Sequence, residues 1–231
     1  MEHTVIQIFS NQWWIYTSIT CFLIVFALLI SKKIKKDNLV KYFKYFGYLI
    51  LIQILFTQIY LFYVHQTWSF ENSLPLSLCR ASIIFAALAL INKKIFFVEW
   101  SVYLGISGGI QSILTPDLSF GNTSYIIFDY YFVHGLLLFV PIFLIYIYKF
   151  KLEKFSSLKA ILYGNIMMLI VFPLNYIFNS NYMYLKIKPT VSNPLLFGGW
   201  PWYIFGFEIV GIVSILIMDC VFRLIPKYLK L

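Results

Sequence analysis

Charged residues are scarce in this chain of 231 residues: only 12% are Asp, Glu, Lys or Arg, whereas 61% are hydrophobic and 21% are aromatic. Soluble globular domains carry roughly 25% charged residues. The uncharged residues form repeated apolar runs of about twenty residues, the length that crosses about 30 Å of hydrocarbon. The composition therefore argues against a soluble domain and predicts one polytopic membrane domain over residues 1–231.

Cysteine and histidine are also rare, with three of each. Cys21, Cys79 and Cys220 fall at different expected depths in different apolar runs, which argues against a disulfide framework. No close group of His, Cys, Asp and Glu has the spacing of metal ligands, so we expect neither a metal nor another cofactor. The amino terminus has no basic residue before its first apolar run, which favours an uncleaved first span over a signal peptide.

The apolar runs predict an all-α bundle of seven transmembrane helices. Their expected positions are about 13–31, 45–65, 75–92, 95–114, 125–148, 159–180 and 201–223. Most lysines lie in short clusters between these runs, as in KKIKKDNLVKYFK and KFKLEKFSSLK, so that fifteen positive residues fall on one side and only Lys186 and Lys188 on the other. The positive-inside rule then predicts a multi-pass protein of the cell membrane, with the amino terminus outside and the carboxyl terminus in the cytoplasm. Because the +9 charge is spread over these turns, it does not indicate a nucleic-acid partner.

Polar residues within the predicted spans gather toward the outer ends of five helices. A charged side chain near the bilayer centre costs at least about 2.5–3.5 kcal/mol, so such residues normally face a bundle interior or a wet cavity. We therefore expect an outer-half polar cavity built from Cys79, Arg80, Gln111, Asp117, Asp129, His134, Asn175 and Glu208. Two further acids are assigned to structural pairs: Glu99 near Lys93 and Lys94, and Asp219 with Arg223 at i,i+4.

Cys79 and Arg80 stand side by side in LPLSLCR, at the start of the third predicted span. A neighbouring positive charge and a helix start both stabilise a thiolate. His134, in YFVHGLLLF, is the one histidine well inside a span and is a candidate base for this thiol, with Asp129, Asn175 or Glu208 as candidate groups to orient it. The simpler interpretations are a cysteine packed as a small hydrophobe, an arginine reaching the headgroups, and a histidine that joins two helices.

The chain also contains a set of short motifs. In chain order they are LPLSLCR, SILTPD, FVHG, PLNY and WPWY. From about residue 45 to 225 the chain resembles the YwaF-like bacterial membrane proteins, which are related to transmembrane protein 164. That resemblance implies an acyltransferase that moves fatty acyl groups onto lysophospholipids with a cysteine and a histidine. The matching positions here are Cys79 and His134.

The resulting hypothesis is a membrane acyltransferase whose partners are membrane phospholipids. His134 would deprotonate Cys79, the thiolate would attack a phospholipid ester, and the acyl thioester would pass to a second lipid. Arg80, Gln111 and Asn175 are candidates to stabilise the developing oxyanion, and Arg80 also to hold the lipid phosphate. Two alternatives stay open: a transporter or substrate-binding membrane subunit with Arg80, Asp129, His134 and Glu208 in a solute cavity, and a non-catalytic assembly factor.

Overall fold

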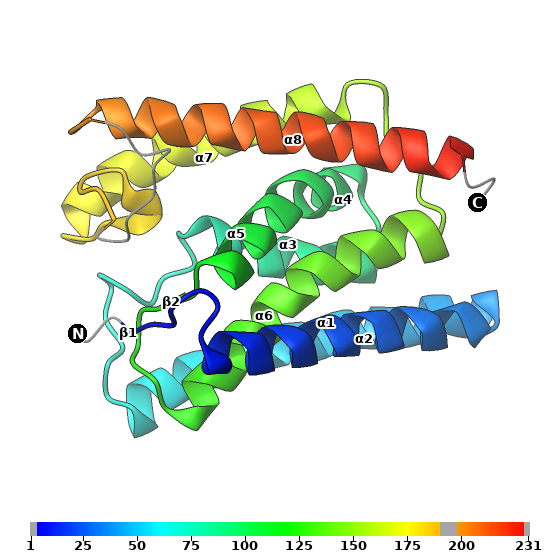
Figure 1. Cartoon of the computed structure of the whole chain (residues 1–231), viewed down its shortest axis with the longest axis horizontal. Helices are drawn as coiled ribbons and strands as arrows, with labels where there is room; N and C mark the ends of the chain where they lie inside the picture. The colour runs from blue at the N-terminus through cyan, green and yellow to red at the C-terminus, as the bar shows by residue number, and fades with distance from the viewer. Residues whose placement is uncertain (1–3, 190–197, 229–231) are drawn as a thin grey trace.

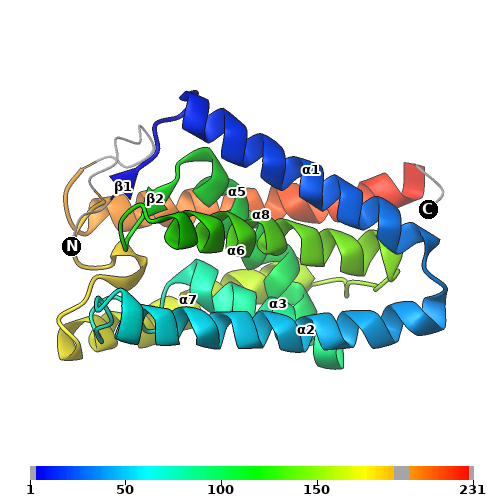
Figure 2. The same ribbon diagram turned by 90° about the horizontal axis from the view of Figure 1, so that it is seen from below.

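The computed structural model describes residues 4–189 and 198–228, and these form a bundle of helices that lie along the long axis of the molecule (Figure 1). The start of the first helix and the end of the last lie at opposite ends of that axis in both ribbon views (Figure 2). The α-helices are α1 (Asn11–Lys33), α2 (Lys36–Ile59), α3 (Leu78–Asn92), α4 (Ile95–Trp100), α5 (Ile106–Leu114), α6 (Ser124–Ile142), α7 (Ser156–Ile177) and α8 (Trp202–Tyr228). Shorter helical segments are η1 (Tyr60–Val64), η2 (Ser101–Gly105), η3 (Phe143–Ile147) and η4 (Tyr182–Tyr184).

Five helices are long and apolar enough to cross a membrane, which confirms an all-α, multi-pass membrane protein. They cover Asn11–Lys33, Asp37–Val64, Ser124–Ile147, Ser156–Ile177 and Trp202–Arg223. The other two predicted spans differ from these five. α3 has 15 residues, or about 22 Å at helical rise, and is thus shorter than the hydrocarbon layer. Residues 95–114 are helical but consist of α4, the π-helical η2 and α5 in succession.

Capping side chains explain where several helices begin. The hydroxyls of Ser10, Ser77 and Thr123 accept hydrogen bonds from the backbone N–H groups three residues later, which satisfies donors that the first helical turn leaves free. Because Ser77 is the cap, α3 begins at Leu78, three residues after the predicted start of this span. Cys79 is therefore the second residue of its helix.

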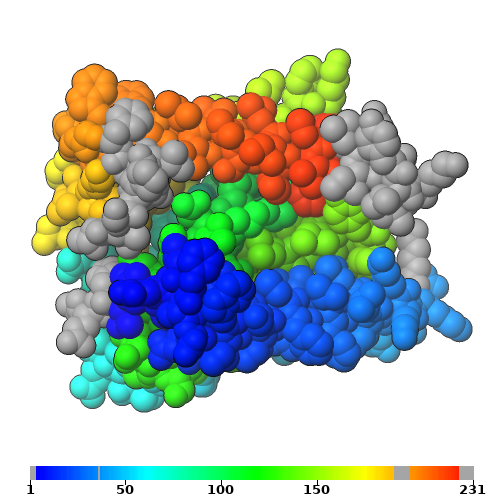
Figure 3. Space-filling view, in the orientation of Figure 1, coloured from blue at the N-terminus to red at the C-terminus, as the bar shows by residue number. Residues whose placement is uncertain are grey.

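The core lies where α3, the α4–η2–α5 segment and α6 pack together, and α6 is the central helix. In the most apolar window of α6, 61% of the residues are buried, against 11% for α1 and for α8. The space-filling view shows α1 and α8 along two edges of the molecule with α6 visible between them (Figure 3). The two edge helices therefore present their apolar side chains to the surroundings, as expected in lipid.

Two acidic residues form pairs away from this central region. Asp219 accepts from Arg223 Nε at 2.8 Å, which confirms the predicted i,i+4 pair. Glu99 is fully buried, but its carboxylate accepts from Ser156 Oγ at 2.7 Å and lies 3.7 Å from Lys159 Nζ. The sequence suggested Lys93 and Lys94 as neighbours of Glu99; the start of α7 packs on α4 and supplies the partners instead.

A two-stranded ribbon closes one end of the bundle, although nothing in the apolar pattern predicted a strand. β1 (Thr4–Val5) pairs antiparallel with β2 (Asp117–Leu118), so that the segment before α1 lies against the segment after α5. Ile6, Leu118 and Phe120 of this region are buried against Trp13 and Ile126. The ribbon thereby holds in place the connection that follows α5, and this connection lies over the site described next.

Candidate functional site

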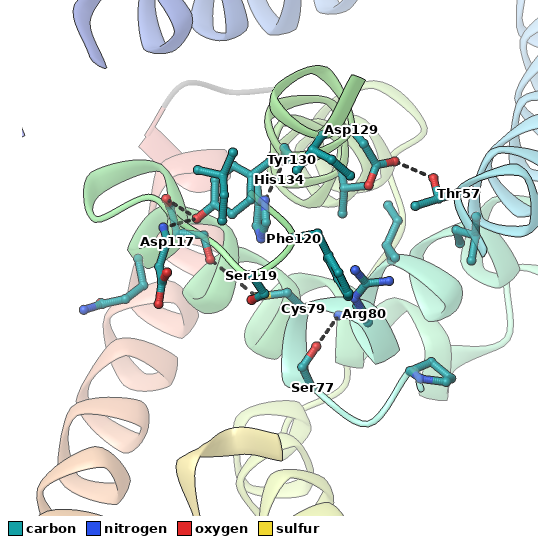
Figure 4. A pocket seen from close by; sticks show the side chains of 18 of the residues that line it. Thr57, Ser77, Cys79, Arg80, Asp117, Ser119, Phe120, Asp129, Tyr130 and His134 are labelled. Carbon is teal, nitrogen blue, oxygen red and sulfur yellow. Dashed lines mark hydrogen bonds between the residues drawn. The ribbon is translucent and has the colours of Figure 1, made fainter. Parts of the chain in front are cut away.

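A cavity of about 330 Å³ lies at the ribbon end of the bundle, between the starts of α3 and α6 and the end of α5. Figure 4 shows most of the residues that line it. Six of the eight residues singled out in the sequence are among them: Cys79, Arg80, Gln111, Asp117, Asp129 and His134. The structure thus brings together side chains from three helices and one connection.

The thiol of Cys79 is half-buried and has a hydroxyl neighbour. Its Sγ lies 3.5 Å from Oγ of Ser112, in the last turn of α5. Gly108 of the same helix also faces the sulfur: a Cβ atom added there would lie 3.1 Å from Sγ. The sulfur therefore occupies space that the missing side chain of Gly108 leaves open.

The imidazole of His134 is almost fully buried, and its hydrogen bond determines its tautomer. Nδ1 lies 2.6 Å from the backbone carbonyl of Tyr130, one turn earlier in α6. A carbonyl oxygen can only accept, so Nδ1 carries the proton and Nε2 of the neutral ring is left as an acceptor. Figure 4 shows the ring beside Tyr130, with its second nitrogen pointing into the cavity.

Cys79 and His134 line the same cavity but hold different partners. Within residues 4–189 and 198–228, no hydrogen bond joins the thiol to the imidazole; the thiol is next to Ser112 and the imidazole donates to Tyr130. Catalytic hydrogen bonds are often loose before substrate binds and can also run through one water. The arrangement provides a thiol and a free base nitrogen within one polar space.

Arg80 places a positive charge on the wall of this cavity. Its guanidinium carbon lies 5.2 Å from the centroid of the Phe120 ring, which comes from the connection held by the ribbon. Among the described side chains, none forms an ion pair with Arg80 within 4 Å. A charge inside a membrane protein normally has a partner, so the free donors of Arg80 are available to an anion in the cavity.

Asp129 is the acidic group on the opposite wall, and it is engaged with α2. Its Oδ1 accepts from Thr57 Oγ1 at 2.8 Å and from Gln53 Nε2 at 3.3 Å. Tyr125 OH lies 2.8 Å from the same Thr57 hydroxyl. These contacts tie α2 to α6 and keep the carboxylate on the wall of the cavity.

Asn175 and Glu208 do not line this cavity. Asn175 is fully buried. Its side-chain amide donates a hydrogen bond to the backbone carbonyl of Tyr182 and accepts hydrogen bonds from the backbone N–H of Tyr182 and from Ser180 Oγ. Glu208 accepts from Asn165 Nδ2 at 2.7 Å, which joins α8 to α7. The sequence indicated their depth along the helices, but their partners depend on how α7 and α8 pack. Neither residue is placed to orient His134.

The sequence did not predict several residues of the site. Tyr130 OH donates to Ser112 O at 2.8 Å and accepts from Asp117 N at 3.3 Å, so it connects α6 to the end of α5. Tyr184 OH donates to Asp117 Oδ2 at 3.3 Å. Burial, with the Asp117 carboxylate as a further cause, raises the pKa of Tyr184 to about 12, so its phenol keeps this proton near neutral pH. The one available hint was the i,i+4 spacing of Tyr130 and His134, which places both on one face of a helix.

No group of three or more His, Cys, Asp or Glu side chains that could hold a metal ion occurs in the part of the chain that the structure describes. All three cysteines are free thiols; Cys21 and Cys220 are exposed, whereas Cys79 is half-buried. Among the described residues, the thiol of Cys79, the imidazole of His134 and the guanidinium of Arg80 line one cavity.

Comparison with known proteins identifies the family of the chain but does not test individual residues of the site. Neither the curated proteins nor the solved structures give a match to this chain. The sequence model of the TMEM164 family matches residues 8–219, a range that contains every residue of the cavity. The chain belongs to the TMEM164 family.

Proposed function

We propose that the protein is a membrane-embedded acyltransferase that moves a fatty acyl group from a phospholipid to a lipid acceptor through a thioester on Cys79. One observation carries this proposal: a thiol, an imidazole with a free base nitrogen and an arginine without an ion pair line the same cavity of about 330 Å³. Membership of the TMEM164 family is consistent with such a role. Within the proposal, the chain is one of the YwaF-like members of bacterial membranes.

The first half of the reaction forms the thioester. His134 Nε2 takes the proton of Cys79, directly or through one water, and the thiolate attacks the ester carbonyl carbon. A carbon–sulfur bond forms as the carbonyl electrons move to oxygen. When the oxyanion collapses, the ester carbon–oxygen bond breaks and the leaving alkoxide takes the proton from the imidazolium, which releases a lysolipid.

The second half reverses the roles of the groups. The hydroxyl of the acceptor lipid gives its proton to His134 Nε2 and attacks the thioester carbonyl. The carbon–sulfur bond breaks, and the thiolate recovers the proton from the imidazolium. Atoms and charge balance without a cofactor, because the acyl group and one proton are all that change places.

Three features of the cavity support these steps. Cys79 lies in the first turn of α3, where the helix dipole favours a negative charge, and Ser112 Oγ is close enough to donate to the thiolate. Arg80 is placed to hold the phosphate of the donor lipid or to stabilise the oxyanion. The backbone carbonyl of Tyr130 accepts a hydrogen bond from His134 Nδ1 and so fixes the orientation of the imidazole.

The test is the lipid product profile of protein reconstituted with a phospholipid that carries one labelled acyl chain. Cys79→Ser and His134→Ala should each lower acyl transfer by at least about a hundredfold, because each removes a group required for the covalent step. A labelled acyl group should be found on the Cys79 peptide of the wild-type protein. His134→Ala should show little of that adduct.

The matched controls are Cys21→Ser and Cys220→Ser, which remove exposed thiols far from the cavity in sequence and should leave transfer unchanged. If Cys79→Ser retained full transfer, the thioester mechanism would be excluded. A different pair of results would assign the cavity to a transporter. In that case the Cys79→Ser variant would bind and transport a solute normally, and the Arg80→Gln variant would lose that transport.

A further inference from the structure

A second recess runs along the face of the bundle between α1 and α2, and its lining is almost entirely apolar. It has a volume of about 920 Å³, with walls from α1 and α2 and a floor from α6. Leu23 and Ala27 lie on one wall, Leu49 lies on the other, and Phe132 and Leu136 form part of the floor. We call this recess the α1–α2 groove.

The packing of the helices explains why the groove exists. α1 crosses α6 closely at Gly135, where an added Cβ would lie 2.9 Å from Thr20 Cγ2, whereas α2 packs mainly on α3. The two helices share only a short turn and then diverge, with α6 between them (Figure 2). The ring of Phe43, which lines the groove from α2, stacks on the ring of Phe143 of η3, with 3.7 Å between the ring centroids.

The groove is separate from the Cys79 cavity, because the two use opposite faces of α6. Asp129, Tyr130 and His134 face the cavity, whereas Phe128, Tyr131, Phe132 and Gly135 face the groove. On the α1 wall of the groove, the hydroxyls of Thr20 and Ser31 donate to carbonyls of their own helix. This part of the wall therefore offers hydrocarbon rather than free hydrogen-bonding groups, which suits an acyl chain.

One end of the groove is positively charged. Lys33 and Lys35 flank Ile34, which lines the groove, and Lys41 lies one helical turn before Tyr45, another lining residue. All three lysines are exposed, and no carboxylate of the described residues lies within ion-pair distance of them. Asp37 is an acid in the same turn and offsets one of these charges. Tyr42 and Tyr45, 54% and 56% exposed, have the position of headgroup-level aromatic residues.

We propose that the α1–α2 groove binds one phospholipid with an anionic headgroup, its acyl chain between α1 and α2 and its headgroup at Lys33, Lys35 and Lys41. Juxtamembrane lysines attract anionic lipids, and the apolar walls exclude water from the chain. The charge at one end and the hydrocarbon surface along the rest fit the two parts of such a lipid. This binding does not depend on acyl transfer at Cys79.

The experiment is native mass spectrometry of the purified full chain after incubation with phosphatidylglycerol or with phosphatidylcholine of the same acyl chains. The wild-type protein should retain one phosphatidylglycerol with at least about tenfold preference over phosphatidylcholine. The combined variant Lys33→Gln, Lys35→Gln, Lys41→Gln should lose that preference. Ala27→Trp, which fills the groove, should lose bound lipid of either kind.

Control variants separate the groove from general charge and from misfolding. The combined variant Lys149→Gln, Lys151→Gln, Lys154→Gln removes the same charge from a different turn and should keep the preference. Leu23→Trp fills the groove from a more exposed position, should Ala27→Trp fail to fold. Equal retention of both lipids by the wild type, or unchanged retention in both filled variants, would overturn the proposal. A dimer without bound lipid would instead assign the groove to a second copy of the chain.

Discussion

At the scale of single residues, the space around the Cys79 sulfur depends on a neighbour that has no side chain. Gly108 leaves the room that Sγ occupies, because an added Cβ would lie only 3.1 Å from the sulfur. That is tighter than an ordinary contact, so a methyl group there would displace the thiol by a few tenths of an ångström. A misplacement of about 1 Å in a reacting group can lower a rate by about a hundredfold.

Gly108→Ala should therefore reduce acyl transfer by at least about tenfold while leaving the melting temperature equal or higher, because alanine favours a helix more than glycine does. Product formation and thermal unfolding, measured on the same preparation, check the two effects. Gly105→Ala is the matched control: its Cβ would meet its nearest atom at 3.7 Å, an ordinary contact. Equal loss of transfer in both variants would show that helix packing, and not crowding of the thiol, is responsible.

The tautomer of His134 is also decided at this scale. Its Nδ1 donates to a carbonyl of its own helix, four residues earlier. The sequence allowed either a base or a residue that joins two helices by a hydrogen bond. The structure shows an imidazole held by its own helix with the second nitrogen in a cavity, which is the arrangement that a general base requires.

At the scale of helices, close crossings are made at small residues. α2 meets α3 at Gly47, where an added Cβ would lie 2.7 Å from Ile91 Cγ1 and 2.8 Å from the carbonyl oxygen of Ala87. A backbone oxygen cannot move aside as a flexible side chain can. Small residues of this kind let helix backbones approach in membranes, where van der Waals packing is a main source of association.

Gly47→Ala should destabilise the protein by about 1–3 kcal/mol, the usual cost of forcing extra volume into a packed interface. The measurement is the apparent melting temperature in detergent. The comparison variant is Gly211→Ala in α8, where an added Cβ meets nothing within 4 Å and the change should be neutral or stabilising. A melting temperature of Gly47→Ala at or above that of the wild type would refute this account of the α2–α3 crossing.

At the scale of the whole molecule, the distribution of lysines indicates which end of the bundle faces the cytoplasm. The turn between α1 and α2 and the segment between η3 and α7 lie at the same end of the bundle as the end of α8 (Figure 1). Both segments are rich in lysine. Together they support the proposal that this end is cytoplasmic and that the Cys79 cavity lies toward the outside.

Single reporter cysteines test that orientation in a background without Cys21, Cys79 and Cys220. Asn122→Cys lies in the connection beside the cavity, and Asn38→Cys lies in the first turn of α2, just after the lysine-rich connection from α1; both positions are exposed. A membrane-impermeant maleimide should label Asn122→Cys in intact cells and Asn38→Cys only after permeabilisation. The reverse pattern would place the cavity on the cytoplasmic side, where a soluble acyl donor has access.

The sequence by itself determined that this chain is a helical membrane protein, because the scarcity of charge and the length of the apolar runs follow from the thickness of hydrocarbon that a helix must cross. It also determined how far each polar residue lies along its helix, since the rise per residue is constant. Only the tertiary structure decided which of these residues meet. The rotation of each helix about its axis and the choice of its neighbours depend on packing. Ser112 and Tyr130 therefore lie in the site, whereas Asn175 and Glu208, although at suitable depths, form hydrogen bonds elsewhere.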